Sequence, residues 1–97
     1  MTGIKIKEIV WDDWNKEHIK KHDLTVEEVE CAVSNFLGHK NGNKGRYILI
    51  GRSGKRLLSI IIKRIDKCVY YIVTARDSDK KERRIAYGKE KPKNSEV

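Results

Sequence analysis

The chain has 97 residues, of which 38% are apolar, enough for one modest hydrophobic core and too few for two independent ones. Its 22 Lys and Arg against 14 Asp and Glu leave a net charge of +8, which favours a polyanionic partner such as RNA. A solvated basic surface without a partner is the alternative. No apolar run reaches membrane-spanning length and the first residues lack the pattern of a signal peptide, so we expect a cytoplasmic protein without a membrane partner.

The amino-terminal segment predicts a short strand followed by a helix. Residues 4–7 alternate apolar side chains with lysine, which indicates a half-exposed strand at a sheet edge. Asp12 is the expected N-cap of the first helix. Three aromatic side chains then share one face of that helix, and they are Trp14, His18 and His22.

A second helix is predicted from the capping box that Thr25 and Glu28 can form. Apolar residues follow at helical spacing, namely Val26, Val29, Val33, Phe36 and Leu37, and Gly38 is the expected end of the helix. Residues 38–45 are glycine-rich and polar, so we expect a flexible loop there.

Three strands and a third helix complete the predicted order. Residues 46–50, 56–64 and 68–76 are expected to form an antiparallel meander. A capping box of Asp79 and Glu82 begins a helix that runs to about Tyr87. Residues 88–97 are a polar tail that we expect to be disordered. The sequence therefore predicts one compact α+β domain over residues 1–87, with helices against an antiparallel sheet in the order β-α-α-β-β-β-α.

The junction of the last strand and the last helix is a candidate phosphate site. Arg76 should emerge at the carboxyl end of a buried strand, beside the helix amino terminus. Arg83 and Tyr87 are four residues apart and share a face of the helix. A cation beside a helix amino terminus is unfavourable unless an anion joins it, which predicts a bound phosphate. A salt bridge from Arg76 to Asp77 or Asp79 is the alternative.

Four segments of the sequence form a pattern with characteristic order and spacing. They are Trp11-Asp12-x-x-Asn15-x-x-His18-Ile19-x-x-His22-x-Leu24-Thr25-x-Glu27-Glu28-Val29-Glu30, Arg46-Tyr47-x-x-x-Gly51, Val73-Thr74-Ala75-Arg76-Asp77 and Glu82-Arg83-Arg84-x-x-Tyr87. This pattern resembles the BrnT family, and the resemblance covers nearly all of residues 8–87. It implies a RelE-like fold and the toxin half of a bacterial type II toxin–antitoxin pair. It also implies metal-independent RNA cleavage, a small acidic BrnA-like antitoxin encoded beside it, and contact with operator DNA only through that antitoxin.

Two positions depart from the family pattern. Asp23 stands where glycine is usual, and we expect the fold to tolerate it because aspartate adopts left-handed backbone more readily than most residues. Lys63-Arg64 stands where a Glu-Arg pair is common, which keeps the arginine and makes the surroundings more basic.

The implied reaction is attack of a ribose 2′-hydroxyl on its own phosphodiester. It needs stabilisation of the phosphorane charge, which arginine supplies, and no metal, cofactor or protein nucleophile. The catalytic candidates are Arg64, Arg76, His22, Glu82 and Tyr87. The two arginines would stabilise charge, His22 would be base or acid, Glu82 would take the 2′ proton and Tyr87 would position the leaving oxygen. The RNA-binding candidates are Arg46, Lys63, Arg83 and Arg84.

Each candidate also has a structural interpretation. His18 and His22 pack beside Trp14 in one alternative, and their i, i+4 spacing lacks a third metal ligand, so no metal site is predicted. Glu82 serves as a helix cap in another, and Tyr87 packs the last helix against the sheet. A non-catalytic RNA- or ribosome-binding module and the scaffold of an operator-binding complex therefore stay open beside the ribonuclease.

Overall fold

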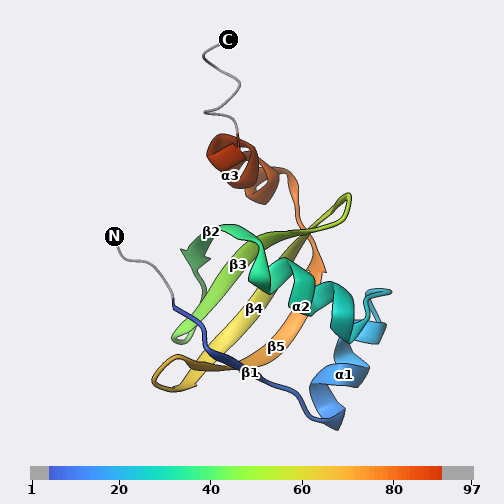
Figure 1. Ribbon diagram of the computed structural model, residues 1–97, viewed down its shortest axis with the longest axis vertical. Coiled ribbons are helices and arrows are strands. Elements are labelled where there is room, and N and C mark those ends of the chain that lie inside the picture. Colours follow the sequence, from blue (N-terminus) through green and yellow to red (C-terminus); the bar gives the residue numbers. More distant parts are fainter. Residues whose placement is uncertain (1–4, 91–97) are drawn as a thin grey trace.

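The protein is a five-stranded sheet with helices on its surface. The structure, a computed structural model, describes residues 5–90, without the side chains of residues 89 and 90. The elements are β1 (Glu8–Val10), α1 (Asp13–Lys20), α2 (Val26–Ser34), β2 (Phe36–Asn41), β3 (Arg46–Ser53), β4 (Arg56–Asp66), β5 (Val69–Asp77) and α3 (Lys80–Glu90). The strand order is β1-β5-β4-β3-β2. As Figure 1 shows, α2 crosses one face of the sheet, α1 lies beside β5, and α3 lies at the end where the β3–β4 hairpin turns.

The sheet is mixed, so the expectation of a purely antiparallel sheet was wrong. β1 pairs in parallel with β5, with Glu8 opposite Val69 and Val10 opposite Tyr71, while the other pairings are antiparallel. Two helices and three strands separate β1 from β5 in the chain, and such a long connection permits parallel pairing where a hairpin would not. β1 does lie at an edge, but it begins at Glu8 rather than in the predicted residues 4–7, of which the first lies outside the described residues. The α+β class is confirmed.

The prediction missed strand β2. The helix ends at Ser34, with Asn35 as its C-cap, and residues 36–41 pair with β3 instead of forming a helix end and a loop. The connecting turn is closed by the Gly42 amide, which donates to the carbonyl of Arg46 at 2.8 Å. Glycine and asparagine have low strand propensity, and the strand forms because its backbone satisfies the open edge of β3.

All three predicted helix starts are confirmed. Asp12 caps α1, with Asn15 completing the box, and Thr25 and Glu28 form the reciprocal bonds at the start of α2. At α3 the amide of Asp79 donates to Glu82 Oε1, and the amide of Glu82 donates to Asp79 Oδ1, both at 2.9 Å. α3 runs to Glu90, past the expected end at Tyr87, and the rest of the predicted tail lies outside the described residues.

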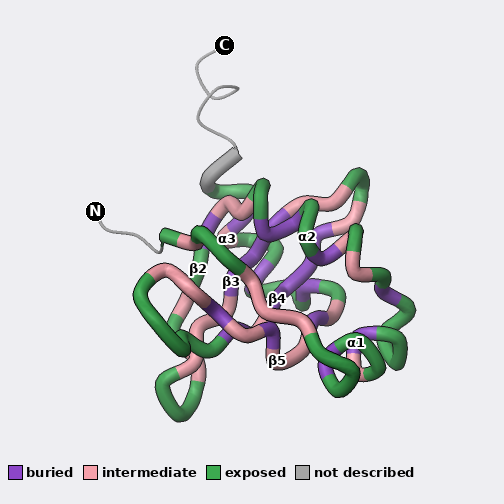
Figure 2. The backbone as a smooth tube through the Cα atoms, turned by 60° about the horizontal axis from the view of Figure 1, so that its bottom comes forward, coloured by how far each residue is buried: buried purple, intermediate pink, exposed green. Residues whose placement is uncertain are grey.

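The core is divided between the two faces of the sheet, and Figure 2 shows its buried residues along the strands and α2. The larger cluster joins α1, α2 and the sheet, and it includes Ile19, Leu24, Val29, Ala32, Val33, Leu49, Leu58, Ile60, Ile62, Tyr70, Ile72 and Ala75. A smaller cluster of Ile50, Leu57 and Ala86 lies under α3. None of the described helices is long and apolar enough to cross a bilayer.

Gly51 permits the close approach of α2 to the sheet. A Cβ at this position would lie 2.0 Å from the carbonyl oxygen of Ala32 and 2.8 Å from its carbonyl carbon. These are backbone atoms of α2, so they cannot move aside without moving the helix. Ala32 and Leu58, the residue that pairs with Gly51 across β3 and β4, are both fully buried. Any shift of the helix therefore opens the larger core cluster.

Glu82 ties α3 to the sheet although its side chain is fully buried. It accepts hydrogen bonds from Arg76 at 2.7 and 2.9 Å and from Ser59 Oγ at 2.7 Å, and Lys40 Nζ lies 3.3 Å away. Burial alone raises the pKa of Glu82, but the hydrogen bonds from Arg76, the Asp79 amide and Ser59 lower it to about 2. The buried carboxylate is therefore ionised and fully hydrogen-bonded.

We expect Gly51→Ala to destabilise the protein by about 1–3 kcal/mol or more, because the new methyl group pushes α2 off the sheet. Chemical denaturation measures this change. Gly88→Ala is the matched control, since nothing lies within 4 Å of a Cβ there. At this exposed position of α3, Gly88→Ala should leave the free energy of unfolding unchanged or raise it by about 0.5–1 kcal/mol. Equal effects of the two variants would contradict the close contact.

The Glu82 pKa predicts acid sensitivity. Because the folded pKa of about 2 lies below the ordinary 4.5, the ionised carboxylate stabilises the folded state above the unfolded pKa, and this contribution disappears as pH falls from about 5 to 2. The pKa difference corresponds to a free energy on the order of 3 kcal/mol. In Glu82→Gln the helix cap persists while the charge is lost, so the unfolding free energy should fall at neutral pH and depend less on pH in that range.

Arg76→Ala tests the other partner. It leaves a buried carboxylate short of its main donors, and we expect a loss of about 3–5 kcal/mol of folding free energy. Arg84→Ala removes the same charge from an exposed position of α3 and should change stability by about 0.5 kcal/mol or less.

A Glu82→Gln protein that keeps the parent's acid profile would show that the carboxylate does not control acid unfolding.

Candidate functional site

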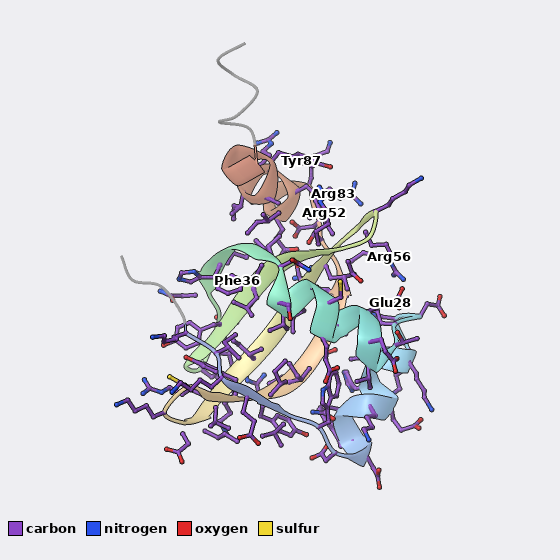
Figure 3. The ribbon with its side chains drawn as sticks, in the orientation of Figure 1. Glu28, Phe36, Arg52, Arg56, Arg83 and Tyr87 are labelled. Atoms are coloured by element: carbon purple, nitrogen blue, oxygen red, sulfur yellow. The ribbon has the colours of Figure 1, made fainter. Side chains whose placement is uncertain are left out.

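A basic cleft opens where the β3–β4 hairpin, the end of β5 and α3 meet. Its volume is about 260 Å³, and its lining residues are Arg52, Lys55, Arg56, Leu57, Asp77, Arg83 and Tyr87. Figure 3 shows Arg52, Arg83 and Tyr87 close to one another beside α3, with Arg56 between them and Glu28 on α2. Four of the lining side chains are cationic and one is a carboxylate, so the cleft favours an anion.

Arg56 is the structural cation of this cleft. Its Nη2 donates to both carboxylate oxygens of Asp77 at 3.1 Å, and its Nε donates to one of them at 3.2 Å. Its Nη1 donates to the carbonyl of Asp23 at 3.2 Å and lies 3.4 Å from Glu28 Oε2. Arg56 therefore joins the hairpin to β5, to α2 and to the turn between α1 and α2, and its charge is compensated.

Arg83, Tyr87 and Lys55 are available for a ligand. Arg83 and Tyr87 share one face of α3, as predicted, and both line the cleft. Tyr87 is 50% exposed, and neither its hydroxyl nor the Arg83 guanidinium bonds to any described residue. Lys55 follows Gly54, whose φ of +62° closes the hairpin turn, and is exposed. Arg52 enters the same cleft from β3.

Arg76 meets the amino terminus of α3, as the sequence predicted, but the anion found there is part of the chain. Both terminal nitrogens of Arg76 bind Glu82, and the partner is neither Asp77 nor Asp79, the two alternatives considered from the sequence. The Glu82 carboxylate also accepts from the Asp79 amide. The place expected for a phosphate is therefore occupied by a buried side chain, and the exposed cations lie on the next turn of α3.

The structure does not bring Arg64 to Arg76. On β4 and β5, Arg64 pairs with Tyr70 while Arg76 pairs with Ser59, so the two arginines lie at opposite ends of the sheet and cannot bind one phosphate. This separation follows from antiparallel pairing, since adjacent strands then end on opposite sides. Arg46 and Lys63, paired across β3 and β4, also lie at the end away from the cleft, and Arg84 is exposed on α3.

His22 lies at the turn between α1 and α2 and is exposed. Its ring is 6.4 Å from that of His18, which stacks on Trp14 at 4.7 Å, so the predicted aromatic face is present. Trp14 is 55% exposed, and this face is therefore at the surface rather than in the core. The next residue, Asp23, has the left-handed φ of 59° expected for the glycine position of the family, and its carbonyl contacts Arg56.

Sequence reasoning missed the cations of the β3–β4 hairpin, Arg52, Lys55 and Arg56. Residues 51–55 were predicted as a connection between strands and Arg56 as the first residue of the next strand, without a functional role for any of the three cations. A signal was available, because the start of β4 must lie beside the end of β5 in an antiparallel meander, next to the candidate helix. Three cations within one turn beside α3 would then have indicated the cleft.

A larger hollow of about 620 Å³ lies between α1 and α2 and is a weaker candidate. Its charged lining mixes acids with lysines, namely Asp13, Glu17, Glu27, Lys16 and Lys20. Such a surface does not favour a polyanion. Among the described residues, no group of three His, Cys, Asp or Glu side chains is arranged to hold a metal ion.

Comparison with known proteins supports the fold. No protein-family model matches the chain, and no curated protein matches it significantly. Among solved structures, the chain is similar to the crystal structure of the Brucella abortus ribonuclease toxin BrnT, with a TM-score of 0.59 and 21% sequence identity, over 75% of this chain and 97% of that one. The mixed sheet, the order of helices and this similarity together show that the chain has a BrnT-like fold.

Proposed function

We propose that this protein is the toxin of a type II toxin–antitoxin pair and cleaves RNA in the basic cleft beside α3. The observation that carries the proposal is the convergence of Arg83, Tyr87, Lys55 and Arg52 on one cleft of a BrnT-like fold. Arginine binds phosphate through a planar set of donors and keeps its charge at all relevant pH values. RNA also suits a chain with a net charge of +8.

The reaction that suits these residues is transesterification within the RNA. The ribose 2′-oxygen attacks the adjacent phosphorus, the bond to the 5′-oxygen breaks, and a 2′,3′-cyclic phosphate and a 5′-hydroxyl result. The proton of the 2′-hydroxyl is lost and the leaving oxygen gains one. Arg83, with Lys55 and Arg52, stabilises the charge of the phosphorane, and Tyr87 is positioned to donate its proton to the leaving oxygen.

Glu82 and Arg76 support this site rather than take part in the reaction. A carboxylate with a pKa of about 2 that is buried and held by four groups is a weak proton acceptor at neutral pH. The Arg76–Glu82 pair instead fixes the first turn of α3, which sets the position of Arg83 and Tyr87. We propose His22 as the proton acceptor because it precedes Asp23, whose carbonyl accepts from the cleft residue Arg56, although His22 itself does not line the cleft.

An RNA- or ribosome-binding module without cleavage is the second candidate. It is favoured by one observation: the carboxylate that lines the cleft, Asp77, is held by Arg56 in a bidentate pair, so the lining supplies cations without an unengaged base. In either case we propose a cytoplasmic protein whose neighbouring antitoxin inserts an acidic segment into the cleft. Operator DNA would then be bound through the antitoxin.

Arg83→Ala should reduce RNA cleavage about a hundred- to a thousandfold, because it removes a preorganised donor to the phosphorane. Tyr87→Phe should slow cleavage while leaving RNA affinity nearly unchanged, since only the hydroxyl is lost. The assay is incubation with single-stranded RNA in EDTA, with detection of cyclic-phosphate ends.

Lys81→Ala is the control, because it removes one positive charge from the opposite, exposed side of α3 and lies outside the cleft. Salt-dependent RNA binding with no cyclic-phosphate product in the parent protein would replace the ribonuclease with the binding module. Full activity in a folded Arg83→Ala protein would place the reaction elsewhere.

Co-expression tests the partner. We expect the small protein encoded beside this one to co-purify with it and to protect the Arg83 region from hydrogen exchange, with association that slows as salt rises. Replacing Arg83 by glutamate should weaken this complex more than Lys81→Glu does. Growth inhibition by the co-expressed pair, or the absence of a complex, would contradict a neutralising partner.

A further inference from the structure

A second basic groove lies at the end of the sheet opposite the cleft. Its volume is about 360 Å³, and its lining residues are Lys5, His39, Tyr47, Arg64, Lys67, Cys68 and Tyr70. Figure 1 shows this end of the sheet, where the β4–β5 hairpin turns near the start of the described chain. Arg64 follows Arg56 by eight residues on β4, so the two sites are about 26 Å apart along the strand.

The cations of this groove lack the carboxylates that neutralise Arg56. No acidic side chain lines the groove, and within the described residues the side chains of Arg64, Lys67 and Lys5 form no salt bridge. Like charges gathered without a counter-charge repel one another, and an anion between them removes that cost. The groove therefore has the charge of an anion site.

Two tyrosines line the groove beside these cations, and they are Tyr47 and Tyr70. Tyr70 is only 6% exposed, and its hydroxyl bonds to no described residue although the side chain lines the groove. Among the described side chains, only the Thr74 hydroxyl is buried without a hydrogen-bond partner. The Tyr70 hydroxyl, which also lacks a partner, is therefore in contact with solvent. Tyr47 packs against Tyr70 with ring centroids 6.4 Å apart and an interplanar angle of 75°. The Tyr70 ring is thus packed against Tyr47 while its hydroxyl stays available.

We infer that this groove binds a nucleotide phosphate of single-stranded RNA at a second position, away from the cleft that cleaves it. Arg64 and Lys67 contact the phosphate, the Tyr70 hydroxyl donates to it, and the half-buried ring of Tyr47 contacts the base or sugar. The choice of RNA as the macromolecule rests on the proposed function, whereas the phosphate site itself does not. The consequence for the substrate is that RNA long enough to reach both ends of the sheet binds more tightly than short RNA.

The site is tested directly by titrating the full chain with uridine monophosphate while following the ring resonances of His39, Tyr47 and Tyr70 by NMR. We expect these resonances to shift with UMP, and we expect uridine and inorganic phosphate to bind at least several-fold more weakly. Arg64→Ala should weaken UMP binding about tenfold or more, since it removes charge-assisted hydrogen bonds. Tyr70→Phe keeps the buried ring and should weaken binding by several-fold.

Lys81→Ala is the charge-matched control and should leave the UMP-induced shifts of His39, Tyr47 and Tyr70 unchanged. With RNA of about twelve nucleotides, Arg64→Ala should also reduce the magnitude of the salt slope by about 0.7. Equal binding of inorganic phosphate or uridine would overturn the assignment, and so would unchanged binding in Arg64→Ala. Cleavage that is absent while UMP still binds through Arg64 and Tyr70 would reject the ribonuclease and leave the groove standing.

Discussion

The buried carboxylate of Glu82 is the constraint on which the functional end of the molecule depends. It receives Arg76 from β5, Ser59 from β4, Lys40 from β2 and the Asp79 amide from its own helix, so four segments meet at one charge. An ionised group in the interior is tolerated only when its hydrogen-bonding capacity is filled. Because each donor comes from a different segment, α3 can dock on the sheet in one orientation, and that orientation turns Arg83 and Tyr87 toward the β3–β4 hairpin.

Four arginines of the described chain divide into two that hold the fold and two that face solvent without a partner. Arg76 and Arg56 belong to the first group, since each is bound to carboxylates on other elements. Arg83 and Arg64 belong to the second among the described residues, and each lines a hollow in which cations prevail. A net charge of +8 does not distinguish the two groups, but function requires the second, because a neutralised arginine has little left to offer a phosphate.

Local signals were predicted well and pairing between distant segments was not. The helix starts at Asp12, Thr25 and Asp79 were correct because a capping box is complete within four residues. β2 was missed because its Gly38, Asn41 and neighbouring Gly42 carry no strand preference, and only the open edge of β3 gives that segment its conformation. Because β2 was not predicted, the salt bridge from its Lys40 to Glu82 was not predicted either.

The sequence by itself determined the α+β class, the helix starts, the resemblance to BrnT and the shared face of Arg83 and Tyr87, because each depends on spacing within a short segment. Only the tertiary structure decided which charges cancel. Glu28 and Asp77 reach Arg56 from segments more than twenty residues away, and the β4–β5 register sends Arg64 to the far end of the sheet from Arg76. Charge pairing acts through space, so residues that look equivalent along the chain become a scaffold in one place and an anion site in another.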